Sequence, residues 1–82
     1  MAQVRGSWFT SLNSSLSRHS MLADVESKLP QITRKILLGP DAQAWYDEGH
    51  AVAIYELVAQ LRGAEACREV GRDAARFAMV ST

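Results

Sequence analysis

The stretch from Glu65 to Phe77 constrains the fold of this chain most, because its apolar and its charged residues both recur at helical spacing. Apolar residues at steps of three and four draw one narrow stripe along a helix. They are Cys67, Val70, Ala74 and Phe77. Each acid of the stretch stands three positions before an arginine, a spacing that brings their side chains together on a helix. The acids are Glu65, Glu69 and Asp73, and the arginines are Arg68, Arg72 and Arg76. We expect a neutral face, suited to solvent or to a specific partner and poorly suited to a polyanion.

Residues that cap or break helices divide the N-terminal half into short helices. Ser7 is the expected N-cap of a first helix that ends near Arg18 or His19, and Ser20 is the expected cap of a second. Pro30 either breaks the second helix or opens the third, and Gly39-Pro40 ends the third.

The C-terminal half contains the strongest helical pattern. Asp47 is the expected cap of a helix that runs to Arg62, Gly63 ends it, and the final helix follows at once. No alternation of period two marks a strand. The sequence therefore predicts an all-α fold, a small bundle of four or five short helices in one domain over residues 1–82. We expect residues 1–5 to be flexible and residues 79–82 to form a tail.

Size and charge limit what such a domain can do. A chain of 82 residues buries only about 60% of its unfolded surface, so some apolar surface should remain for a partner. Residues 1–38 carry net charge +3, residues 39–62 carry −3, and the whole chain is neutral. This division favours intramolecular or head-to-tail pairing and disfavours general binding to nucleic acid or to an anionic membrane.

The single cysteine, Cys67, rules out an internal disulfide and fits a reducing compartment. No signal sequence or membrane-spanning run is visible, so we expect a cytoplasmic protein that does not contact a membrane.

Candidate reactive groups are few and scattered. His19, His50 and Cys67 lack the close paired spacing of a zinc site. Cys67 lies on an apolar stripe, where cysteine behaves as a small core residue. Asp47 and Glu48 are adjacent and point in different directions on a helix, unlike an acid and base that face one substrate. We therefore expect no metal, no cofactor and no enzymatic activity.

Two helices around Gly63 invite comparison with a helix-turn-helix DNA-binding motif. The arginines of the last helix would then contact DNA. Acids interleave these arginines, however, whereas a DNA-binding helix usually presents an uncompensated basic stripe. DNA binding is therefore the third hypothesis for function.

Two aromatic doublets, Trp8-Phe9 and Trp45-Tyr46, stand beside expected helix starts. In one interpretation, one member of each doublet packs in the core while its neighbour lies at the rim. In the other, the outer members anchor an interface, where tryptophan and tyrosine are enriched. The sequence supports both equally.

Several of these positions together resemble an uncharacterised helical family, known largely from myxobacteria and of unknown function. The matching residues are Gly6 with Trp8 and Phe9, Leu29-Pro30, Trp45-Tyr46, and Arg68-Glu69-Val70-Gly71-Arg72. The family domain is about twice as long as this chain, so the resemblance implies that the chain corresponds to the N-terminal part of that domain or to a compact relative. The resemblance implies a bacterial, cytoplasmic and non-enzymatic regulatory or scaffolding role.

The leading hypothesis is a protein-interaction module that associates with itself, as a homodimer, or docks a larger partner. Its expected interface residues are Trp8, Trp45, Tyr46, Arg68, Arg72 and Arg76. The alternative hypothesis is a small-molecule sensor with an apolar pocket between the long helix and the aromatic doublets.

Overall fold

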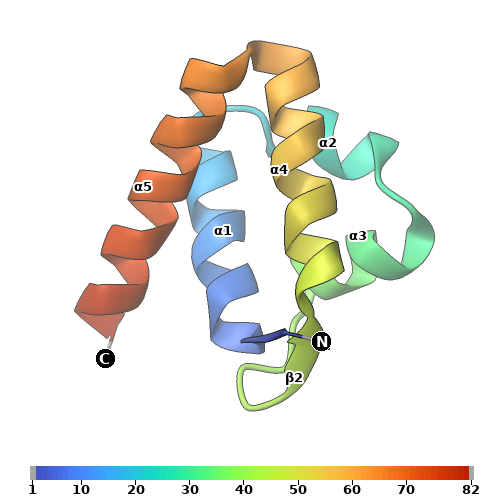
Figure 1. Ribbon diagram of the computed structural model, residues 1–82, viewed down its shortest axis with the longest axis vertical. Coiled ribbons are helices and arrows are strands. Elements are labelled where there is room, and N and C mark those ends of the chain that lie inside the picture. Colours follow the sequence, from blue (N-terminus) through green and yellow to red (C-terminus); the bar gives the residue numbers. More distant parts are fainter. Residues whose placement is uncertain (1, 82) are drawn as a thin grey trace.

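The computed structural model describes residues 2–81, with side chains described through Arg76. Helices dominate it, and two short strands accompany them (Figure 1). In chain order the elements are β1 (Gln3–Arg5), α1 (Gly6–Arg18), α2 (Leu22–Lys28), α3 (Gln31–Leu38), β2 (Trp45–Asp47), α4 (Glu48–Arg62) and α5 (Ala64–Ser81). The five helices within residues 2–81 confirm the predicted all-α bundle.

The three long helices α1, α4 and α5 form the centre of the bundle, and α2 and α3 pack beside α4 and α1 (Figure 1). Apolar side chains from all five helices meet in one core. Its fully buried members are Phe9, Leu12, Leu16, Val25, Leu37, Ile54, Val58, Val70 and Ala74. The stripe expected on α5 therefore faces the core at Val70 and Ala74, while Cys67 is partly buried. The side chain of Phe77, the last member of that stripe, lies outside the described residues.

The helix ends at Pro30, Asp47 and Gly63 confirm the sequence signals. The Asp47 carboxylate accepts a hydrogen bond from the Gly49 amide at 2.8 Å, which caps α4. Gly63 ends α4 with a φ of 93°, a conformation that favours glycine, and α5 begins at the next residue. Pro30 is the N-cap of α3, so it opens that helix.

The two serine caps expected in the first half are wrong. Ser7 lies inside α1, which begins one residue earlier, and the Gly6 amide donates instead to the carbonyl of Ala44 at 2.9 Å. Ser20 has a φ of 58°, and its amide donates to the Ser17 carbonyl at 3.1 Å. This turn after α1 delays the start of α2, whose N-cap is Met21.

A small antiparallel sheet joins the two halves of the chain, where the sequence showed no strand. β1 pairs with β2 in the register Gln3↔Asp47, Val4↔Tyr46 and Arg5↔Trp45. Residues 3–5, within the segment expected to be flexible, form β1, and α5 continues to Ser81, into the segment expected to be a tail. The sheet anchors the start of α1 beside the start of α4 (Figure 1).

Candidate functional site

The two-stranded sheet sorts its side chains by the alternation of extended backbone. The middle residues Val4 and Tyr46 are partly buried and pack against the core. The flanking residues are exposed and form what we term the outer sheet face. This face consists of Gln3, Arg5, Trp45 and Asp47.

Trp45 dominates the outer sheet face. Its residue surface is 55% exposed, and the guanidinium carbon of its cross-strand neighbour Arg5 lies 4.7 Å from the centroid of its ring. A cation at this distance over an indole is a favourable cation–π contact. Arg5 also donates to the Gln43 side-chain oxygen at 3.4 Å. The exposed indole is therefore held in place by a charged neighbour.

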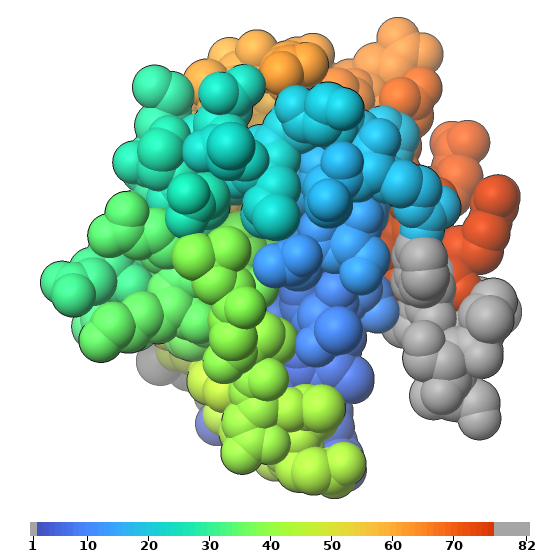
Figure 2. Space-filling view, turned by 180° about the vertical axis from the view of Figure 1, so that it is seen from behind, coloured from blue at the N-terminus to red at the C-terminus, as the bar shows by residue number. Residues whose placement is uncertain are grey.

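The loop before β2 is ordered by one aspartate. The Asp41 carboxylate accepts from the Gln43 amide at 3.0 Å, and its carbonyl accepts from the Ala44 amide at 3.0 Å. Seen from behind, the segment that follows α3 lies against α1 (Figure 2). These contacts fix the approach of the chain to Trp45.

Tyr46, the second member of the doublet, serves the fold. Its ring meets Phe9 edge to face, with centroids 5.6 Å apart and an interplanar angle of 82°. Its hydroxyl accepts from the Asp41 amide at 3.0 Å. Of the two adjacent aromatics expected at an interface, the structure leaves Trp45 largely exposed and uses Tyr46 in packing.

Trp8 is also engaged in packing, between α1 and α4. It is partly buried and forms a side-chain hydrogen bond with Tyr55. Burial raises the pKa of the Tyr55 hydroxyl above its ordinary value; the bond with Trp8 opposes that shift, and nearby Cys67 adds to it. The Cys67 thiol donates to the Tyr55 carbonyl at 3.3 Å. Trp8 and Cys67 thus belong to one packed contact.

The arginines of α5 are exposed, as an interface residue must be. Arg68, Arg72 and Arg76 all face solvent, but within the described residues no ion pair joins them to an acid. The row of ion pairs expected along α5 is therefore not formed.

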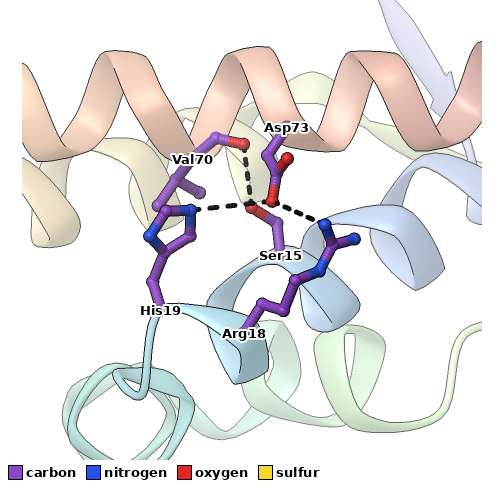
Figure 3. A network of polar contacts seen from close by, with 5 residues as sticks. All are labelled: Ser15, Arg18, His19, Val70 and Asp73. Atoms are coloured by element: carbon purple, nitrogen blue, oxygen red, sulfur yellow. Dashed lines mark hydrogen bonds and ion pairs between the residues drawn. The ribbon is translucent and has the colours of Figure 1, made fainter.

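Asp73 turns instead toward the end of α1 (Figure 3). Its carboxylate lies 3.4 Å from the Arg18 guanidinium and 3.6 Å from the imidazole of His19. Close by, the buried Ser15 hydroxyl donates to the Val70 carbonyl at 3.1 Å. This network joins α1 to α5.

A shallow groove lies between the α2–α3 link and α4, with a volume of about 160 Å³. We term it the α4 groove. It is lined by Lys28, Leu29, Pro30, Ala53, Glu56, Leu57 and Gln60. It lies away from the aromatic doublets, where the sensor hypothesis expected a pocket, and it is smaller than the roughly 300–1,000 Å³ of most small-molecule sites.

His50 is occupied by a structural contact. Its Nδ1 atom lies 2.9 Å from the Thr33 hydroxyl, which joins α3 to α4. Among the described residues, no three His, Cys, Asp or Glu side chains gather as a metal site would require. None of the helices in that part of the chain is both long and apolar enough to cross a membrane.

Large apolar side chains remain exposed over one part of the sequence. Among the described residues, the exposed large apolar side chains all lie in the segment from α3 to the second turn of α4. They are Ile32 (68%), Leu38 (49%), Trp45 (55%) and Val52 (49%).

Comparisons with protein-family models, with curated proteins and with solved structures gave no match to this chain. Its function must therefore be inferred from its surfaces.

Proposed function

We propose that this chain is a non-enzymatic protein-interaction module and that the outer sheet face is its main contact surface. The observation that carries the proposal is Trp45, a large aromatic side chain that is 55% exposed and stacked on Arg5. Tryptophan and arginine are enriched among the residues that dominate the energy of protein interfaces.

The local structure favours binding through this face. A side chain that is already held in place loses less conformational freedom when a partner covers it. The Asp41 turn and the stack on Arg5 restrict Trp45 before any partner arrives. Burial of the apolar surface of an indole is energetically favourable. A partner that covers the Trp45 ring would therefore be bound more tightly.

The α5 arginines are a second, peripheral part of the proposed interaction surface. Arg68, Arg72 and Arg76 are exposed and lack ion pairs within the described residues, so their charges are available to orient a partner. Exposed charges of this kind affect the association rate and the choice of partner more than the affinity.

We also propose a biological setting for this module. The regulatory role and the bacterial, cytoplasmic setting rest on the resemblance to the myxobacterial family and on the lack of paired cysteines.

Photo-crosslinking from position 45 tests the interaction. The chain would carry p-benzoylphenylalanine in place of Trp45 and be irradiated inside the cells that produce it. The matched control carries the same group in place of Glu26, on α2 and outside both surfaces. We expect protein adducts from position 45 that are absent from the control. No adduct, or equal adducts from both positions, contradicts the proposal.

A further inference from the structure

We propose that the partner of the outer sheet face is the α4 groove of a second copy of this chain, into which Trp45 inserts. This inference rests on the proposed function and names the partner of the same surface. Three observations support it: the apolar lining of the groove, the charges at its sides, and the neutrality of the chain.

The groove suits an aromatic ring. Its apolar lining includes Leu29, Pro30 and Leu57, and its volume is about 160 Å³. A protein cavity of roughly 150 Å³ accommodates a benzene ring. Because the groove is open to solvent, the indole of Trp45 can lay its apolar edge inside while its polar edge stays at the rim.

The charges of the two surfaces are complementary. Beside Trp45, the outer sheet face carries one cation, Arg5, and one acid, Asp47. The groove carries one acid, Glu56, and one cation, Lys28. Within the described residues neither Glu56 nor Lys28 has an ion pair. Docking would place Arg5 against Glu56 and Asp47 against Lys28.

Arg5 has hydrogen-bond donors left for Glu56 of a second copy. Its recorded interactions are the stack on Trp45 and one long hydrogen bond to Gln43. A guanidinium has five N–H donors in a fork that matches a carboxylate, so several remain for Glu56 of a second copy.

A second copy is the occupant that these charges favour. The chain is neutral overall, so two copies approach without net repulsion. The contact joins two different surfaces of the chain, and when it is made twice about a two-fold axis it closes a dimer. The expected species therefore has twice the 9.0 kDa mass of one chain.

Charge reversal gives the decisive test, read as molar mass by light scattering and sedimentation over a range of concentrations. Arg5→Glu and Glu56→Arg each place like charges together, and we expect each alone to weaken self-association about tenfold or more. An equimolar mixture of the two variants should restore dimers, because each contact in the mixed dimer again joins opposite charges. Trp45→Ala should weaken association by a similar factor or more without restoration by either variant.

Two controls separate binding from folding. Lys35→Glu reverses an exposed charge on α3 that lies outside the outer sheet face and the α4 groove, and it should leave association unchanged. Glu56→Arg changes an exposed residue that has no ion pair among the described residues, so its melting temperature should match that of the wild-type chain.

A wild-type chain that stays at 9.0 kDa at millimolar concentration overturns the inference, as does a mixture that fails to restore dimers. The proposed function is tested separately from the identity of the partner. If position 45 cross-links to a different protein while the chain stays monomeric, the second copy is excluded and the interaction surface stands.

Discussion

Gly6, the first residue of α1, lies directly against the main-chain carbonyl of Asp41 in the loop that leads to β2. Its amide donates a hydrogen bond to the Ala44 carbonyl at 2.9 Å, so Gly6 contacts the same loop at both Asp41 and Ala44. No side chain fits between the two backbones, because a Cβ atom on Gly6 would overlap the Asp41 carbonyl. This close approach positions the loop that presents Trp45.

Gly6→Ala should destabilise the fold, because the backbone of α1 or of the loop must move to admit the methyl group. Forcing extra atoms into a packed site typically costs about 1–3 kcal/mol. Chemical denaturation measures the change in unfolding free energy. A variant as stable as the wild-type chain would show that the loop does not pack on α1 as described.

Gly71→Ala is the matched substitution and should act in the opposite direction. A Cβ atom there would lie 3.6 Å from a ring carbon of Tyr55, an ordinary contact. Alanine is favoured over glycine inside a helix by about 1 kcal/mol. We expect the unfolding free energy to rise by up to about that amount, and a clear loss would place α5 closer to α4 than the structure has it.

Ionisation of Tyr55 should make the fold less stable in alkali. Its pKa is raised in the folded chain above the ordinary 10.0, so the unfolded chain loses this proton first. The unfolding free energy should therefore begin to fall near pH 10 and stop falling, for this group, above the folded pKa. Alkaline denaturation of wild type and Tyr55→Phe measures this component, which the variant should lack. Identical pH profiles would contradict the burial of the hydroxyl.

Asp73→Asn should weaken the link between α1 and α5 by a small amount. Its partner Arg18 is more than half exposed, and ion pairs of that kind contribute about 0.2–1 kcal/mol. The loss should shrink in 1 M salt, which screens exposed charges. Unfolding at low and high salt measures it, with Glu69→Gln as the control, because Glu69 is an exposed acid of the same helix without an ion pair among the described residues.

Local sequence signals predicted most of the helical framework. Asp47 begins α4 and Gly63 ends it through interactions within one turn of backbone, so both helix ends can be predicted without knowing the fold. The strands could not be found in this way. Each has three residues, too few for alternation to be recognised, and each is completed by a segment far away in the sequence. The prediction that Ser20 caps α2 was wrong for a related reason, because the Ser20 amide closes the turn after α1 by donating to the Ser17 carbonyl.

The candidate site was predicted in part. Composition and doublet spacing singled out Trp45 and Tyr46 equally, and only the pairing with β1 shows that they point to opposite faces. Arg5 was missed because its role depends on the cross-strand register. The ion pair of Asp73 was misassigned because α1, rather than the spacing within α5, supplies its partner.

The emission of Trp45 alone gives the most direct measurement of the central claim that this indole is a contact between two copies of the chain. In the variant Trp8→Phe, checked for native helicity by circular dichroism, Trp45 is the only tryptophan. As protein concentration rises, the account predicts that the emission maximum moves to shorter wavelength and that quenching by iodide declines, because the groove of a second copy covers the ring. Emission and quenching typical of a solvent-exposed indole at every concentration up to the millimolar range would contradict it.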